Sequence, residues 1–236
     1  NVLKCVHRAG LEPAGIVFEP LASSAATLLA EERHVGVLLL DIGGGTTDIA
    51  VYANGGAIYT STIPVGGNIL TNDIAIGLKT TFSDAEHVKK TIASALPCEG
   101  GEFTVKTLDG RTSEPLTRGQ LQAIVAPRLL EIFRMAKAQL GSRLPRDVML
   151  AEVVLTGGGA HLQGVEQAAS DFFGVPARIG VPTSIGGLTD AVKAPEYATA
   201  VGLVLFGPKG DGATWNGVAG RNFFAKITNW FGDLWN

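Results

Sequence analysis

The 236-residue sequence predicts an α/β fold in which a smaller α/β subdomain is inserted into the main domain, followed by a C-terminal amphipathic helix. Three observations support this prediction. Two apolar strands, at 35–42 and 152–156, each run into a turn of three consecutive glycines. Between them, a polar alternating stretch precedes a long helical pattern at 118–140. Near the end of the chain, large apolar side chains repeat at helical spacing.

Composition restricts the class of protein. Hydrophobic residues make up 46% of the chain and charged residues 17%, as in a folded globular protein rather than a disordered one. A net charge of -3 gives no reason to expect nucleic acid as a partner. Two cysteines, Cys5 and Cys98, cannot build a disulfide framework, so we expect a reducing cytoplasm. No apolar run reaches the length of a transmembrane helix.

The first segment, 1–34, contains two predicted helices and a short strand. Residues 2–9 follow a helical pattern that ends at Gly10, and 15–19 is predicted to be extended. The alanine-rich stretch 20–32 suits a helix with proline at its start. Because the chain starts with Asn inside a helical pattern, we expect it to be the C-terminal portion of a longer protein.

The first glycine turn joins the strand at 35–42 to a second strand, so it closes a β-hairpin. Consecutive glycines let backbone N–H groups approach a ligand closely, and successive N–H donors form a concave nest for phosphate oxygens. Asp41, at the end of the first strand, could hold a hydrated Mg²⁺. A glycine-rich turn with a capping Asp is the alternative. The predicted phosphate ligands are Gly43, Gly44, Gly45, Thr46 and Thr47.

The sequence of this hairpin, Asp-Ile-Gly-Gly-Gly-Thr-Thr-Asp at 41–48, resembles the second phosphate loop of the actin, sugar kinase and DnaK-type chaperone superfamily. Its strand–turn–strand pattern differs from a P-loop or a Rossmann turn, both of which lead into a helix. The segments 11–12, 19–25 and 195–203 resemble the FtsA family of bacterial actin-like cell-division proteins, so the resemblance covers nearly the whole chain. It implies an actin-like ATPase (ribonuclease H-like) fold.

A third strand is predicted at 57–63, and the glycine pair Gly66 and Gly67 then precedes a helix. Together with Asp73, this pair resembles the Gly-Gly-x-x-x-Asp stretch that runs past the nucleotide in actin relatives. Glycine pairs before helices are common, so a structural role is the alternative. The pair is therefore a second predicted element of a nucleotide site.

The next helix carries a charged pair. Ser83 and Glu86 predict a capping box for a helix that continues through Lys90. Glu86 and Lys89 are three residues apart and share one helical face. A solvent-exposed ion pair is one interpretation. The superfamily resemblance implies instead that these two side chains contact the ribose or the adenine of a nucleotide.

The stretch 98–116 predicts a small sheet with a turn at 109–110. Thr117 and Gln120 form a predicted capping box for the helix that follows, and Pro127 should kink that helix or split it in two. We expect 66–145 to form the inserted subdomain, as in the upper part of actin's larger half. The segments 35–65 and 146–206 would form the nucleotide-binding subdomain.

The second glycine turn, Gly157, Gly158 and Gly159, follows the strand at 152–156, and a helix is predicted from about Leu162. The N-terminus of such a helix offers unpaired N–H groups and the positive end of a dipole. The turn resembles the adenosine motif of the same superfamily, which implies that the glycines hold the adenosine. His161 has no carboxylate placed near it by sequence, and we predict no catalytic residue.

The chain then predicts a short strand at 177–180 and a closing helix at 195–206 with Tyr197, Ala200, Val201 and Val204 on its core side. Five glycines and polar residues in 207–220 indicate a flexible linker. Residues 221–236 predict an amphipathic helix that lies in a membrane interface. A helix that folds back on its own domain, or an oligomer contact, is the alternative. The membrane-facing residues would be Phe223, Phe224, Ile227, Trp230, Phe231, Leu234 and Trp235.

The resemblance to the FtsA family implies a function. It implies a protein that binds ATP and Mg²⁺, forms an actin-like polymer with itself, and contacts lipids on the cytoplasmic face of the inner membrane at the division site. There it would anchor the FtsZ ring, whose C-terminal tail docks on the inserted subdomain. An actin-like scaffold of type IV pilus assembly and a sugar or acetate kinase-type phosphotransferase are the alternatives. Because hydrolysis in the superfamily also uses the other half, we expect little turnover from this chain alone.

Overall fold

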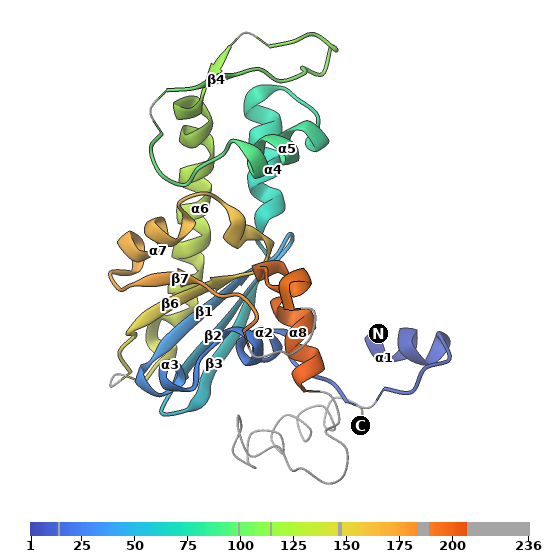
Figure 1. Cartoon of the computed structure of the whole chain (residues 1–236), viewed down its shortest axis with the longest axis vertical. Helices are drawn as coiled ribbons and strands as arrows, with labels where there is room; N and C mark the ends of the chain where they lie inside the picture. Colours follow the sequence, from blue (N-terminus) through green and yellow to red (C-terminus); the bar gives the residue numbers. More distant parts are fainter. Residues whose placement is uncertain (14, 99, 114, 146–147, 184–188, 207–236) are drawn as a thin grey trace.

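The computed structural model describes residues 1–206 except 14, 99, 114, 146–147 and 184–188. A five-stranded sheet forms the lower part of the molecule in Figure 1, and a helical extension rises from one end of it. The strands are β1 (Val37–Ile42), β2 (Thr47–Ala53), β3 (Gly56–Ile63), β4 (Glu102–Phe103), β5 (Leu116–Thr117), β6 (Glu152–Thr156) and β7 (Ala177–Ile179). The α-helices are α1 (Val2–Arg8), α2 (Glu19–Thr27), α3 (Ala30–Val35), α4 (Gly67–Leu78), α5 (Phe82–Thr91), α6 (Arg118–Leu140), α7 (Val165–Phe173) and α8 (Ala198–Leu205).

Short 3₁₀ helices complete the described secondary structure: η1 (Gly141–Arg143), η2 (Gly158–His161), η3 (Thr189–Val192) and η4 (Pro195–Tyr197). Strand order in the main sheet is β3-β2-β1-β6-β7. β1, β2 and β3 form an antiparallel meander, whereas β1, β6 and β7 are parallel. β1 is therefore the central strand, and both glycine turns follow strands that are direct neighbours.

Two hydrophobic clusters cover the two faces of the sheet. Since side chains alternate along a strand, Leu38 and Leu40 of β1 pack on one face and Leu39 on the other. The larger cluster joins the sheet to α4, α5, α6 and α7. The smaller cluster contains Leu21 and Leu28, which place α2 and its C-terminal end on the opposite face.

The extension consists of α4, α5 and the upper part of α6, together with the two-stranded sheet of β4 and β5 (Figure 1). The predicted turn at 109–110 is present, and Gly110 takes a positive φ of 81° there. The prediction of a small sheet is confirmed, and the bounds 66–145 stay our proposal for the inserted subdomain. α1 stands apart from the sheet and buries none of its residues.

The capping box of Thr117 and Gln120 is confirmed at the start of α6, but Pro127 does not split this helix. A proline removes one backbone hydrogen bond and leaves the carbonyl four residues earlier without a partner. Both Pro127 and Ala123 are exposed, so water can satisfy that carbonyl. Of the two predicted outcomes, a kink or a split, the split is therefore wrong.

The first helical region also differs from the prediction. Residues 15–18 form no strand, and the predicted helix 20–32 consists of two helices, because Leu28 is extended. The guanidinium of Arg33 donates to the carbonyls of Ser24 and Leu28, at 2.9 and 3.2 Å. These bonds satisfy the end of α2, so the chain can turn there before α3 begins.

Two further predictions are corrected. Thr81, not Ser83, caps α5, because its hydroxyl accepts from the N–H of Asp84 at 3.1 Å. In the closing helix only Val201 of the four predicted core residues is buried; Tyr197, Ala200 and Val204 are exposed. The side of α8 that carries Gly202 packs against α2, since a Cβ on Gly202 would lie 1.9 Å from the carbonyl oxygen of Ala22.

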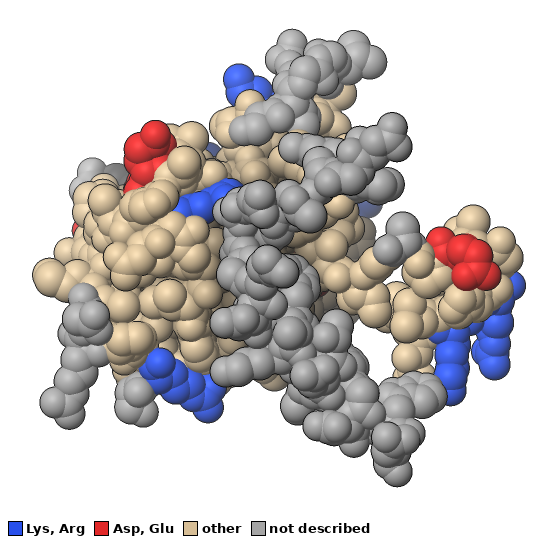
Figure 2. Space-filling view, turned by 90° about the horizontal axis from the view of Figure 1, so that it is seen from below, with Lys and Arg blue, Asp and Glu red and all other residues tan. Residues whose placement is uncertain are grey.

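The predicted linker at 207–220 and the predicted amphipathic helix at 221–236, with its seven membrane-facing residues, lie outside the described residues. Within the described part of the chain, every helix is too short or too polar to cross a membrane. Seen from below, the basic side chains of the main body are few and scattered (Figure 2). This face offers no broad cationic surface among the described residues.

Candidate nucleotide-binding site

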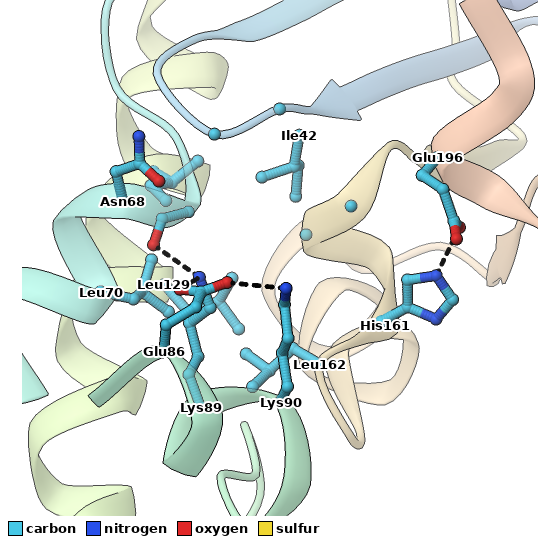
Figure 3. A pocket seen from close by; sticks show the side chains of 16 residues that line it. Ile42, Asn68, Leu70, Glu86, Lys89, Lys90, Leu129, His161, Leu162 and Glu196 are labelled. Carbon is cyan, nitrogen blue, oxygen red and sulfur yellow. Dashed lines mark hydrogen bonds and ion pairs between the residues drawn. The ribbon is translucent and has the colours of Figure 1, made fainter. Parts of the chain in front are cut away.

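A cavity of about 570 Å³ lies where the main sheet meets the extension. It has the size of a small-molecule site. Figure 3 shows it from close by: α4 and α5 form one wall, and the two glycine turns and the short helix η2 form the others. Leu70, Leu129, Ile132 and Leu162 give it an apolar part. The polar or glycine lining residues are Gly43, Gly44, Gly67, Asn68, Glu86, Lys89, Lys90, Gly158, Gly159, His161 and Glu196.

The first glycine turn is fastened to the start of α4. The carbonyl oxygens of Gly43 and Gly44 accept from the N–H groups of Gly67 and Asn68, both at 2.8 Å. Gly66 lies directly against the turn, because a Cβ there would be 2.5 Å from the carbonyl oxygen of Gly43. The first N–H groups of α4 are thus used by the turn, which fixes its position at the mouth of the cavity.

The predicted phosphate ligands separate into two groups. Gly43 and Gly44 line the cavity. Gly45, Thr46 and Thr47 are not among its lining residues. Thr47 is buried, and its hydroxyl donates to the carbonyl of Val65 at 2.8 Å. The structure therefore gives the Thr47 hydroxyl a role in holding the hairpin to the segment before α4.

In the second glycine turn, Gly158 and Gly159 line the cavity and Gly157 does not. Gly157 has a φ of 79°, and a Cβ there would be 2.3 Å from Oδ1 of Asp41. A Cβ on Gly159 would be 2.4 Å from the side chain of Ile42. These two glycines let the second turn pack against the end of β1. A Cβ on Gly158, by contrast, would meet no described atom within 4 Å.

The helix expected from about Leu162 begins at Val165, after the 3₁₀ helix η2. Leu162 is extended, and Gly164 takes the left-handed conformation as N-cap with a φ of 74°. The helix therefore starts three residues later than expected, and the short helix η2 stands between it and the strand. The turn offers close backbone approach at Gly158 and Gly159.

The α5 wall carries the predicted charged pair. Nζ of Lys89 lies 2.6 Å from Oε2 of Glu86, and Nζ of Lys90 lies 3.3 Å from the other carboxylate oxygen. Thr71 of α4 donates to Glu86 at 2.5 Å and accepts from Lys89 at 2.8 Å. Partial burial acts to raise the pKa of Glu86, but hydrogen bonds from Lys89 and Thr71 outweigh it and hold that pKa below its ordinary value.

Asp41 lies away from this cavity. Its Oδ2 accepts from the hydroxyl of Ser23 in α2 at 2.5 Å and from that of Thr199 in α8 at 3.1 Å. Burial raises the pKa of Asp41, the two hydroxyls partly oppose this, and Asp48 adds to it. Oδ1 lies next to Gly157, and it is the oxygen that would accept from a water molecule of a bound Mg²⁺. The lining residues fit a nucleotide, whereas a hydrated Mg²⁺ fits only through this one oxygen.

Several lining residues escaped prediction. Asn68 directly follows the predicted glycine pair, and Lys90 directly follows Lys89. Their position next to predicted site residues is the sequence feature that could have identified them. The sequence alone places no carboxylate near His161, yet in the structure its Nε2 lies 2.5 Å from Oε2 of Glu196. These two residues are 35 positions apart, and the fold alone brings them together.

Comparison with known proteins identifies the family. The family model described as cell division protein FtsA matches residues 38–202, a span that includes both glycine turns and the α5 wall. The chain belongs to the FtsA family. The resemblance drawn from the glycine turns and their flanking segments is thereby confirmed, and the relatives of this chain are described as cell division proteins.

Curated FtsA relatives cover most of this chain. FtsA of Pseudomonas aeruginosa is 42% identical over 210 residues, which are 88% of this chain and 50% of that protein. FtsA of Escherichia coli K12 is 39% identical over 217 residues, 88% of this chain and 52% of that protein. FtsA of Bacillus subtilis is 39% identical over 209 residues, which are 87% of this chain and 46% of that protein. The chain thus spans about half the length of the curated relatives it matches.

Solved structures confirm the actin-like fold. MreB5 of Spiroplasma citri bound to ADP has a TM-score of 0.71 at 22% identity, with 87% of this chain and 64% of that chain covered. The PilM-PilN type IV pilus biogenesis complex has a TM-score of 0.65 at 24% identity, with 87% and 56% covered. At these identities the likeness concerns the fold alone. The FtsA family assignment favours the cell-division protein over the pilus scaffold and the sugar or acetate kinase.

Proposed function

We propose that this chain is the nucleotide-binding half of an actin-like cell-division protein and that it binds ATP in the cavity between its two glycine turns. The observation that carries the proposal is the meeting of Gly43 and Gly44 with Gly158 and Gly159 around one cavity beside the cationic Lys90. Backbone N–H groups and a cation suit phosphates, and the apolar part of the cavity suits the base. The related fold of Spiroplasma citri MreB5 has been solved with ADP and with AMPPNP.

The finer features of the predicted function belong to the same proposal. Asp41 would hold Mg²⁺ through water. The protein would polymerise with itself at the cytoplasmic face of the inner membrane, and its inserted subdomain would receive the C-terminal tail of FtsZ. The seven apolar side chains of 221–236 would bind the membrane interface, because their helical spacing places them on one side.

Nucleotide binding can be tested on the full chain by saturation-transfer NMR with ATP and Mg²⁺, which detects weak complexes. We expect transfer to the adenine and ribose protons of ATP. Gly158→Val should abolish it, because Gly158 lines the cavity and a Cβ there has open space, so the added bulk should block the ligand and leave the fold intact. Gly56→Val is the matched control, since Gly56 also has open space but does not line the cavity. Equal transfer in both variants would contradict the proposal.

Membrane binding can be tested by flotation with liposomes of phosphatidylethanolamine and phosphatidylglycerol. The full chain should float, and a chain that ends at Gly220 should stay in the dense fraction. Insertion of apolar side chains supplies the free energy, at about 1.5–3 kcal/mol for each one fully buried. Because the segment carries only two basic residues, Arg221 and Lys226, and one acidic residue, Asp233, its weak positive charge should make added salt have little effect. Equal flotation of the two chains would refute this part of the proposal.

A further inference from the structure

One side of the cavity carries an ion pair that the proposed function does not use. His161 belongs to η2 and Glu196 to η4, and both line the cavity on the side across from Lys89 and Lys90 (Figure 3). Nε2 of His161 lies 2.5 Å from Oε2 of Glu196. The side chains are half exposed, so the pair contributes little to stability. Its position at the cavity points to a role in binding.

The backbone holds this pair in place. The N–H of Gly157 donates to the carbonyl of Pro195 at 3.1 Å, and the hydroxyl of Thr156 donates to the same carbonyl at 3.0 Å. The segment that carries Glu196 is thus fastened to the second glycine turn. A carboxylate held in this way keeps its position relative to Gly158 and Gly159.

Charge decides which part of a nucleotide this side of the cavity can receive. The hydrogen bond from His161 lowers the pKa of Glu196, so the carboxylate is ionised at neutral pH. An anion here repels phosphates, which find backbone glycines at Gly43 and Gly44 and a cation at Lys90. The nucleoside, whose amino and hydroxyl groups can donate hydrogen bonds, is the part of the ligand that can lie beside the carboxylate.

An ionised carboxylate only accepts hydrogen bonds, and it offers about four acceptor positions, of which the His161 contact uses one. At the purine edge formed by C6 and N7 it favours an amino group and disfavours a carbonyl oxygen, as in major-groove readout of nucleic acids. We propose that Glu196 faces this edge and selects a 6-amino purine over a 6-oxo purine, and that His161 orients its carboxylate. This inference rests on the proposed nucleotide site.

The test compares ATP with inosine triphosphate, which carries oxygen in place of the 6-amino group. Competition in saturation-transfer NMR on the full chain should show about tenfold tighter binding of ATP, the difference expected from one hydrogen bond to a charged group. Glu196→Gln should bring the ratio close to one, because an amide can donate to the oxygen as well. Glu166→Gln removes the same charge from an exposed position of α7 and should keep the original ratio.

The positioning role of His161 has its own readout. His161→Ala should lower the ratio, and His161→Gln, whose amide can still donate to Glu196, should restore part of it. An unchanged ratio in Glu196→Gln, or equal binding of the two nucleotides by the unmodified chain, would overturn this inference and leave the site intact. Absence of any ATP signal would instead overturn the proposed function.

Discussion

Lys89 of α5 donates to the hydroxyl of Thr71 in α4 over 2.8 Å. It also donates to the carbonyl of Gly67 at 3.1 Å and to Glu86 at 2.6 Å. An ammonium group has three N–H donors, so these contacts occupy all of them. Lys90, whose side chain is 67% exposed, is the cation better placed to bind a ligand, and Lys89 ties the two helices together.

This division of roles predicts that substitution of Lys89 lowers stability, whereas substitution of the adjacent Lys90 weakens ligand binding. Lys89→Met removes the donor that links Thr71 and Gly67 of α4 to Glu86 of α5, so the free energy of unfolding in urea should fall by about 1–3 kcal/mol. Lys90→Met should change it by no more than about 0.5 kcal/mol but should weaken ATP binding in the NMR assay. A stable Lys89→Met variant that loses ATP would show that Lys89 is the ligand contact.

Gly66 predicts a steric effect at the first glycine turn. A Cβ there would lie 2.5 Å from the carbonyl oxygen of Gly43 and 2.8 Å from those of Gly44 and Thr46. Gly66→Ala should therefore destabilise the fold by about 1–3 kcal/mol. In this variant, hydrogen exchange should accelerate at the N–H groups of Gly67 and Asn68, which are bonded to the turn in the unmodified chain.

The control for that experiment is Gly56→Ala, because a Cβ there would meet no described atom within 4 Å. Its exchange rates and its stability should stay close to those of the unmodified chain. If Gly66→Ala behaved in the same way, the turn would not be fastened to α4 as described.

Asp41 predicts a pH dependence of stability. Burial raises its pKa above the ordinary 3.8, so the folded state holds the proton more tightly than the unfolded state does. The stability that this gives is present below pH 3.8 and is lost as pH rises through the folded-state pKa. Asp41→Asn keeps an acceptor for Ser23 and Thr199 and should be more stable than the unmodified chain at pH 7.

Thermal unfolding between pH 4.5 and 8 measures this effect, and the gain in Tm should increase with pH. Asp171→Asn is the matched control on the exposed face of α7, where Gln167 can still donate to the new side chain. A lower Tm for Asp41→Asn at every pH would contradict the prediction. The same variant should lose any Mg²⁺ dependence of ATP binding.

ATP hydrolysis by this chain alone should be undetectable. His161 lies beside the cavity, but its ring contacts Glu196, and Asp41, which would hold the metal ion, does not line the cavity. Phosphate release measured over hours with ATP and Mg²⁺ should equal that of buffer. Turnover that Gly158→Val abolishes would show that the residues of this half suffice for the chemistry.

Local patterns in the sequence predicted much of the fold and the site. The hairpin at 41–48, the second glycine turn and the Glu86–Lys89 pair each depend on residues within one segment, and the structure brings parts of all three to one cavity. The match to the FtsA family confirms the resemblance drawn from such segments.

Tertiary contacts account for what the sequence did not predict. The ion pair of His161 and Glu196 joins residues 35 positions apart. The outward-facing Val204 follows from the contact of Gly202 with Ala22, and a pattern of apolar residues could not reveal that contact. Asp41 points toward Ser23 and Thr199 because side chains alternate along β1, and its neighbours in space come from two distant helices.

The uninterrupted α6 has a mechanical consequence. Its 23 residues span about 34 Å, from the cap at Thr117 beside the two-stranded sheet to Gln139, which accepts from Ser61 of β3 at 3.5 Å. Because α6 continues through Pro127, a single helix connects the outer end of the extension to the edge strand of the main sheet. A partner that binds the outer end of the extension would therefore contact a helix whose other end contacts the edge strand β3.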